Sequence, residues 1–259
     1  MNNYDDYLKR EADYQDLKIT KNPRAYLSNF YNDESSKFRL KCRDEAIGDL
    51  YEKRVLDLGC GDGFASMEAL RAGAYVTAID ISPKSIDYLI SLAKKEKLNH
   101  RLEARVMDAH QLEFEDESFD IVFGNGILHH LPNLECAVEE IKRVLKMSGH
   151  AVFLEPLGMN PLISIFRKST PNCRTSDEKP FTMKELAIIR EKFSNVQFSY
   201  FECITLITKI LHLLKLSSLA KTLQLFFVKL DKKILKVKDN AKTTFFQKMS
   251  WQILIDMTK

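Results

Sequence analysis

Short runs of β-branched and aromatic residues alternate with helical segments along the middle of the chain, and this alternation constrains the fold more than any other feature. A strand, a helix and a second strand in succession build a parallel sheet, so the pattern predicts an α/β fold with helices on both faces of a sheet. The strands predicted in this region are Arg54–Leu58, Tyr75–Asp80, Arg101–Met107, Phe119–Gly124 and His150–Glu155.

The segments between and after these strands carry their own start and stop signals. Ser82 and Pro83 suit the first turn of a helix, and apolar residues follow at helical spacing. A second helix is predicted at Asn133–Met147, with Gly149 ending it. Later in the chain the pattern predicts a helix at Thr182–Lys192 and strands at Val196–Phe201 and Trp251–Met257.

The cysteines indicate a reducing environment. They are five in number, scattered and without a CxxC pair, so they favour neither a disulfide framework nor a zinc site, and no metal is expected. The first ten residues are polar and acidic, unlike a secretory signal, and no uncharged run reaches the roughly 18 residues that a membrane span requires. Together these features predict a cytoplasmic protein.

A glycine-rich turn follows the first predicted strand. Within Val55–Ser66, glycines occupy positions 59, 61 and 63 where the strand passes into a helix. A residue without Cβ lets a ligand approach the backbone there, and the helix that follows presents unpaired N–H groups. A dinucleotide-binding turn of the GxGxxG type would need one more glycine at position 64, which is Phe64. A nicotinamide oxidoreductase is therefore disfavoured.

Carboxylates stand at the ends of the first three predicted strands. Asp57 would sit awkwardly beside a pyrophosphate, but it suits the positively charged amino group of a methionine moiety. Asp80 follows Gly59 by twenty-one residues, and a carboxylate there can accept hydrogen bonds from both ribose hydroxyls. Asp108 would place a carboxylate near an adenine amino group. Asn125 then ends a polar turn beneath the methionine end.

These elements, in this order and spacing, resemble the motifs of the class I, Rossmann-like, S-adenosylmethionine-dependent methyltransferases of the small-molecule type. The resemblance covers residues 54–155 well. It implies a seven-stranded, mostly parallel sheet with an antiparallel last strand, and S-adenosylmethionine bound across the carboxyl ends of the strands, leaving S-adenosylhomocysteine as product. The positions expected to contact the cofactor are Asp57, Gly59, Cys60, Gly61, Asp80, Ile81, Asp108, Ala109 and Asn125.

The resemblance also implies a division of the chain. Residues 51–203 form the methyltransferase core, and residues 249–259 contain its closing strand. Residues 1–50 are expected to form an N-terminal helical lid. Residues 204–248 would form a basic, amphipathic helical insertion that leaves and re-enters the sheet at its ligand edge, near the substrate side.

Lysines are concentrated in this insertion. The segment from Thr205 to Lys248 contains ten lysines and two aspartates. Its formal charge is therefore +8, in a chain whose net charge is +3. A basic face beside an apolar one suits a lid, a homodimer contact or peripheral contact with anionic lipid, and a solvated lysine face over ordinary core packing is equally compatible. The predicted apolar stripes are Ile207, Ile210, Leu211 and Leu214 in one helix, and Leu223, Phe226, Phe227, Leu230 and Ile234 in the next.

The methyl acceptor is expected beside the fourth and fifth strands. Methyl transfer from a sulfonium is an in-line displacement, so the protein must mainly hold the acceptor atom close and aligned. If the acceptor is a hydroxyl, histidine is the residue best suited to take its proton. We predict that His129 or His130 is a general base, oriented or assisted by Glu155. Alternatively, both histidines pack or cap the following helix.

Three polar residues on the segment after residue 156 have two possible roles. Arg167, Arg174 and Glu178 either clamp a charged acceptor or tie the segment to its neighbours, and the second role is favoured.

The sequence thus predicts a methyltransferase that acts on an oxygen or nitrogen of a small-molecule acceptor, which is hydrophobic or lipid-linked. Two alternatives stay open. The basic insertion would suit an RNA or DNA methyltransferase, although no Asn-Pro-Pro-Tyr-type tetrad follows the fourth strand, which disfavours nucleic acid as a partner. A member that binds the cofactor for non-methylation chemistry, or as a scaffold, would retain the same motifs.

Overall fold

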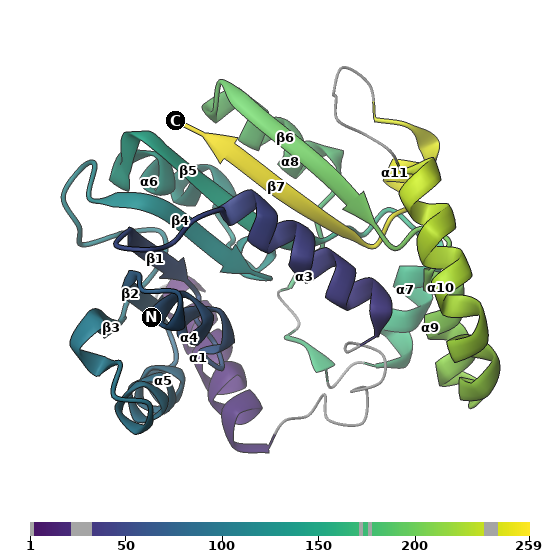
Figure 1. Cartoon of the computed structure of the whole chain (residues 1–259), viewed down its shortest axis with the longest axis horizontal. Coiled ribbons are helices and arrows are strands. Elements are labelled where there is room, and N and C mark those ends of the chain that lie inside the picture. Colours follow the sequence, from purple (N-terminus) through teal and green to yellow (C-terminus); the bar gives the residue numbers. More distant parts are fainter. Residues whose placement is uncertain (1–2, 22–32, 171–172, 176–177, 236–242) are drawn as a thin grey trace.

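A seven-stranded sheet forms the centre of the protein, with strand order β3-β2-β1-β4-β5-β7-β6 (Figure 1). The structure is a computed structural model that describes residues 3–21, 33–170, 173–175, 178–235 and 243–259. The strands are β1 (Arg54–Leu58), β2 (Tyr75–Asp80), β3 (Leu102–Val106), β4 (Phe119–Asn125), β5 (Leu145–Pro156), β6 (Asn195–Phe201) and β7 (Gln252–Thr258).

The strand directions agree with the fold predicted from the sequence. β1, β2, β3, β4 and β5 pair in parallel, whereas β7 runs antiparallel to both of its neighbours, β5 and β6. The fold class is therefore confirmed as a mostly parallel α/β sheet whose last strand is antiparallel. Because the parallel strands share one direction, the residues at their carboxyl ends meet at the same edge of the sheet.

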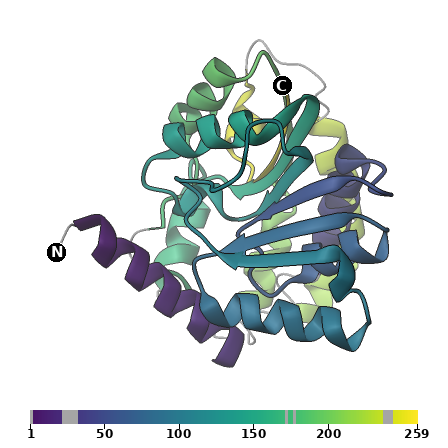
Figure 2. The ribbon, with the colours of Figure 1, turned by 90° about the vertical axis from the view of Figure 1, so that its left-hand side faces the viewer.

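Helices cover both faces of the sheet (Figure 2). Apolar residues of α3, α4 and α5 pack on one face, and those of α6 and α8 pack on the other. The helices are α1 (Asn3–Lys21), α3 (Glu34–Ile47), α4 (Phe64–Arg71), α5 (Pro83–Lys95), α6 (Leu134–Val144), α7 (Pro161–Ser169), α8 (Met183–Lys192), α9 (Leu206–Leu213), α10 (Ser217–Ile234) and α11 (Phe245–Lys248), and two short 3-10 helices are η2 (Asn99–Arg101) and η3 (Leu128–His130). Among the described residues no helix is both long and apolar enough to cross a bilayer.

The helix predicted at Asn133–Met147 is shorter than expected. α6 ends at Val144, and Leu145 is already extended, fully buried and paired with Phe119 of β4. A buried apolar residue opposite a neighbouring strand gains more from the sheet than from a further helical turn, so tertiary packing overrides the helical spacing. Gly149 consequently lies inside β5 and does not terminate the helix.

Helix α1 of the N-terminal segment and the helices of the insertion lie outside the sheet layers, whereas α3 packs on the sheet. α1 lies along α5, and α9 and α10 pack against each other at the end of the sheet that carries β6 (Figure 1). Three parts of these predicted units, residues 1–2, 22–32 and 236–242, fall outside the described residues.

The buried face of α10 differs from the predicted apolar stripe. Its buried residues are Ala220, Gln224, Val228 and Asp231, whereas Phe226 is 61% exposed. A polar contact explains the difference. The carboxylate of Asp231 accepts hydrogen bonds from the backbone N–H groups of residues 204 and 205, at 2.8 and 3.0 Å, at the start of α9. This anchor sets the rotation of α10 and leaves part of the predicted stripe facing outward.

A buried ion cluster joins the insertion to the N-terminal helices. The ammonium of Lys209 in α9 is fully buried, 2.9 Å from Asp33 Oδ2 and 3.6 Å from Glu202 Oε1. Arg39 of α3 also pairs with Glu202, at 2.5 Å. The Lys209 ammonium lies 5.3 Å from the centre of the Trp251 ring. Because charges out of water must be paired, this lysine holds α9 against α3.

We expect Lys209→Met to lower the free energy of unfolding by about 3–5 kcal/mol, because it leaves the carboxylate of Asp33 buried without its cation and Glu202 with Arg39 alone. Urea denaturation followed by circular dichroism measures the change. Lys221→Met is the matched control, since it removes an exposed lysine from the neighbouring helix. Equal effects of the two substitutions would contradict the assignment.

Candidate active site

A cavity of about 780 Å³ opens at the carboxyl edge of the parallel strands, and α1 forms one of its walls. Its lining includes every position predicted to contact the cofactor: Asp57, Gly59, Cys60, Gly61, Asp80, Ile81, Asp108, Ala109 and Asn125. His129 and His130 line the same cavity, but Glu155 does not. The fold thus brings together residues that are spread over more than seventy positions in the sequence.

The glycine turn is built by backbone hydrogen bonds to the end of β2. The N–H groups of Gly59 and Cys60 both donate to the carbonyl oxygen of Ile79 at 2.9 Å, and that of Gly61 donates to the Asp80 carboxylate at 2.9 Å. A Cβ on Gly59 would lie 2.8 Å from the Ile127 side chain, so its absence serves packing. Gly61 has φ +52° and open space beside it, so the approach of a ligand to the backbone is possible there.

Asp57 is a buried carboxyl group beside a buried arginine. Its Oδ2 accepts a hydrogen bond from Ser66 Oγ at 2.6 Å. Burial, and next the negative charge of Asp80, raise the pKa of Asp57 to about 7, against the opposing effects of Ser66 and Arg43. Arg43 of α3 lines the same cavity, and its Nη1 is buried with no hydrogen-bond partner among the described residues. The site therefore offers one buried carboxyl and one unused guanidinium N–H.

The other two strand-end carboxylates are already hydrogen bonded. Asp80 accepts from Ser82 N at 2.9 Å through its second oxygen, and burial raises the pKa of this carboxyl. Asp108 accepts from the hydroxyl of Tyr4 at 2.5 Å and from His110 N at 2.9 Å. Each oxygen of Asp80 uses one lone pair, so both can accept a further donor from the cavity.

The His–Glu pair predicted from the sequence forms, and Glu155 lies behind it. Glu155 is fully buried, and its Oε2 lies 2.7 Å from Nδ1 of His129. Its Oε1 accepts the backbone N–H groups of Ile127 and Leu128 at 3.1 and 2.9 Å. Glu155 thus fixes the η3 turn and the ring of His129 from within the sheet, and it does not reach the cavity.

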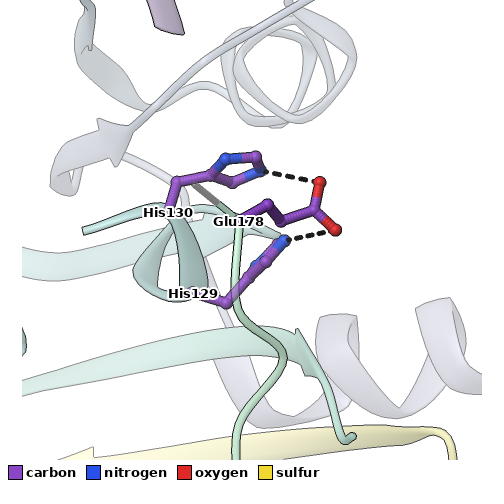
Figure 3. Close-up of side chains that lie close together, drawn as sticks. All are labelled: His129, His130 and Glu178. Carbon is purple, nitrogen blue, oxygen red and sulfur yellow. Dashed lines mark ion pairs between the residues drawn. The ribbon is translucent and has the colours of Figure 1, made fainter. Parts of the chain in front are cut away.

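Glu178 faces both histidines. Its Oε1 lies 3.7 Å from Nε2 of His129, and its Oε2 lies 3.8 Å from Nε2 of His130 (Figure 3). Arg167 donates to Oε1 at 2.6 Å and to the backbone oxygen of Glu178 at 2.9 Å. Arg174 donates to the backbone oxygens of Arg167 and residue 170. The arginines therefore tie this segment to its neighbours, although both also line the cavity.

His129, His130 and Glu178 include the types of atom that ligate transition metals, and they are the one such group among the residues that the structure describes. The carboxylate, however, is already paired with the guanidinium of Arg167, and Arg174 Nε lies 3.9 Å away. A divalent ion would be repelled by these two cations. We therefore interpret the group as an ion cluster.

The two histidines differ in their electrostatics. Burial acts to lower the pKa of His129, but the hydrogen bond to Glu155 and the negative charges of Glu155 and Glu178 outweigh it, so the pKa is raised. Burial and next the charge of His129 lower the pKa of His130, against the effect of Glu11. At neutral pH His130 is consequently the more available proton acceptor of the pair.

Several site residues come from helices that precede the core and that sequence reasoning did not single out. Tyr4 and Glu11 of α1 and Arg43 of α3 belong to polar, helical stretches without a motif. Their positions follow from how α1 and α3 dock, which no local pattern encodes. None of the described residues of the basic insertion lines the cavity, but Lys209 lies 5.3 Å from the ring of Trp251, which does line it.

The fold and the site define a class of protein. A family model described as a methyltransferase domain matches residues 56–153, which span the strands and turns of the cavity. Over these residues the chain is similar to the methyltransferase domain family.

One curated relative is similar to about half of the chain. The chain is 34% identical over 131 residues to the ubiquinone biosynthesis O-methyltransferase of Nitrosomonas europaea, an alignment that covers 49% of this chain and 54% of the relative. The chain thus spans about half the length of that relative.

Two solved structures share the fold over nearly the whole chain. Phospholethanolamine N-methyltransferase 2 of Haemonchus contortus superimposes with a TM-score of 0.65 at 19% identity, covering 100% of this chain and 61% of that one. Geranyl diphosphate C-methyltransferase of Streptomyces coelicolor A3(2) gives 0.64 at 13% identity, covering 97% of each. Identities this low show the fold alone.

Proposed function

We propose that the protein is an S-adenosylmethionine-dependent methyltransferase that methylates an oxygen or nitrogen of a small-molecule or lipid-like acceptor. The observation that carries the proposal is that all the positions assigned to cofactor contact line one cavity, beside His129 and His130. The matched family and the relative named for ubiquinone biosynthesis support it. Both structural neighbours are complexes with S-adenosylhomocysteine, which supports the same cofactor here.

The residues of the cavity suit the charged end of this cofactor. Asp57 would face its ammonium group, and the unused N–H of Arg43 would donate to its carboxylate. A buried carboxyl whose pKa is close to neutrality can meet a cation at little cost, because binding of the cation stabilises the ionised form. The sulfonium of the bound cofactor supplies the methyl group that is transferred.

The adenosine end would lie along the second and third strands. Asp80 keeps a lone pair on each oxygen for the ribose hydroxyls, and Asp108 with Ala109 lies where adenine is expected. Tyr4 of α1 now occupies one Asp108 oxygen. Because α1 also lines the cavity, we assign α1 the role of a lid within the predicted segment 1–50, whereas α3 of that segment packs on the sheet.

We expect the affinity for S-adenosylhomocysteine to rise with pH as Asp57 ionises. The pKa of this carboxyl is about 7, so it is mostly protonated at pH 6 and mostly ionised at pH 8. Only the ionised form attracts the ligand's ammonium, so the dissociation constant should fall by about tenfold between these pH values. Titration calorimetry measures it. Asp57→Asn should flatten the dependence, whereas Asp87→Asn, at an exposed position on α5, should not.

The histidine pair lies where an acceptor hydroxyl would lose its proton. His130 is the better candidate for the general base, because burial and the neighbouring His129 lower its pKa and keep it neutral. Glu155 would act through His129, whose ring it holds in place. In this arrangement His129, His130 and Glu155 form the acceptor side of the site.

Replacing His130 by alanine should lower kcat for a hydroxyl acceptor by about 100-fold or more and leave the affinity for S-adenosylhomocysteine unchanged. The assay supplies cofactor with a trideuterated methyl group and prenylated phenols or ethanolamine phospholipids as acceptors, and mass spectrometry detects the product. His100→Ala, at an exposed site in η2, is the control. If His130→Ala and the corresponding His129→Ala both keep the wild-type turnover, the general-base proposal is wrong.

The same assay separates the alternatives. Tight binding of S-adenosylhomocysteine without any methylated acceptor would indicate a member that uses the cofactor for other chemistry or as a scaffold. Methylated tRNA or DNA, together with a gel shift, would identify a nucleic-acid methyltransferase.

We further propose that the α9–α10 region rests on an anionic lipid surface. Leu214, Leu216 and Leu219 are exposed around the turn between these helices, and Leu214 is 63% exposed. Exposed lysines at positions 215 and 221 flank them. Apolar side chains flanked by lysines favour the boundary of an anionic bilayer. At that boundary the protein would meet a lipid-like acceptor.

In sedimentation with vesicles, we expect several-fold more protein to bind phosphatidylcholine with phosphatidylglycerol than phosphatidylcholine alone, and salt to reduce the binding. Leu214→Gln combined with Leu219→Gln should abolish it. Met147→Gln, an exposed apolar residue of β5, is the control. If the protein does not sediment and the leucine variants instead convert a dimer to a monomer in sedimentation velocity, the surface is a homodimer contact and the lipid proposal is wrong.

A further inference from the structure

Helix α1 is fixed to the core on both sides of Glu11. Near its start, the Tyr4 hydroxyl donates to Asp108 at 2.5 Å. About three turns later, Asp16 accepts from Ser82 Oγ at 2.5 Å and pairs with Lys84 at 3.2 Å, at the N-terminus of α5. The position of Glu11 over the cavity is therefore set by two anchors and does not depend on its own contacts alone.

Glu11 meets His130 at the wall of the cavity. It is only 1% exposed, and its Oε2 lies 3.1 Å from Nδ1 of His130, an ion-pair contact that lies outside hydrogen-bond geometry. Its other oxygen accepts the Thr175 hydroxyl, and the Tyr7 hydroxyl, one turn earlier on α1, donates to the backbone oxygen of His130. One face of α1 thus contacts the main chain and the ring of His130 together.

We propose that Glu11 is a positioning residue for His130: it holds the proton on Nδ1 and so leaves the lone pair on Nε2 for the methyl acceptor. The catalytic consequence rests on the proposed function, whereas the tautomer does not. A negative carboxylate close to one imidazole nitrogen favours the proton on that nitrogen, and Glu11 is closer to Nδ1 (3.1 Å) than Glu178 is to Nε2 (3.8 Å). Figure 3 shows Nε2 of His130 directed toward Glu178.

The two histidines are then oriented by carboxylates from two different parts of the fold. Glu155, which orients His129, is part of β5 and belongs to the sheet. Glu11 belongs to α1, which also contacts the strand-end carboxylate Asp108. Only His130 therefore depends on the docking of α1, and an undocked helix would leave it without its orienting group.

Several charged and titratable groups surround His130, and each of them affects its titration in a pH experiment. His129 lies beside it with ring centres 4.2 Å apart, and Glu178 faces Nε2 while itself paired with Arg167. Glu11 faces it from α1, and the Asp80 carboxyl also feels its charge. Removing the charge of Glu11 alone leaves the others in place.

The tautomer and titration of His130 can be followed without an acceptor. The experiment records long-range ¹H–¹⁵N correlation spectra of the ¹⁵N-labelled full chain between pH 5 and pH 9, with His130→Gln to assign the resonance among the six histidines. We expect Nδ1–H in the wild type. Glu11→Gln should move the titration midpoint to lower pH and mix the two tautomers, because the favourable charge is lost. Asp13→Asn, an exposed site on the same helix, should change neither.

Glu11→Asp keeps the negative charge but shortens the side chain. It should therefore return the titration midpoint of His130 toward the wild-type pH more fully than it restores the Nδ1–H tautomer. In the methyl-transfer assay, Glu11→Gln should lower kcat by about tenfold with an unchanged KM for the cofactor. Binding of S-adenosylhomocysteine confirms that each variant is folded. A His130 signal that is the same in the wild type and in Glu11→Gln overturns the inference. A wild type with the expected tautomer but no methyl transfer overturns only the proposed function.

Discussion

The turn that carries His129 and His130 depends on one buried carboxylate, that of Glu155. Burial of an unpaired carboxylate costs several kcal/mol, yet this one accepts backbone N–H groups from three successive residues, 127 to 129, and the ring of His129. Glu155 is placed by the pairing of β5 with β4, and the three N–H groups follow β4 directly. The register of two neighbouring strands thus sets the orientation of the histidine-bearing turn.

The parts of the site that lie on strand ends could be predicted from the sequence, because their position follows from local order. Once the strands are parallel, Asp57, Asp80 and Asp108 must meet at one edge, and the structure places them in one cavity. The pairing of His129 with Glu155 follows from the same reasoning. The roles assigned to these residues remain predictions that the experiments above test.

Residues set by long-range docking could not be predicted. Arg43 and Glu11 lie on helices whose sequences contain no motif, and their place in the cavity depends on how those helices pack. The rotation of α10 was predicted wrongly for a related reason: apolar spacing suggested one buried face, but hydrogen bonds to Asp231 selected another. In both cases a few polar contacts between distant segments decide the geometry, and a pattern of hydrophobicity carries no information about them.

The position of β7 has a consequence for how the protein is made. β7 follows every other strand in the sequence, yet it lies between β5 and β6 in the sheet, and β6 pairs with it. While the chain emerges from the ribosome, the first five strands can assemble as their residues appear, but β6 has no edge to join. Its apolar residues cannot pair into the sheet until β7 has been synthesised. Assembly of this end of the sheet is therefore among the last steps of folding.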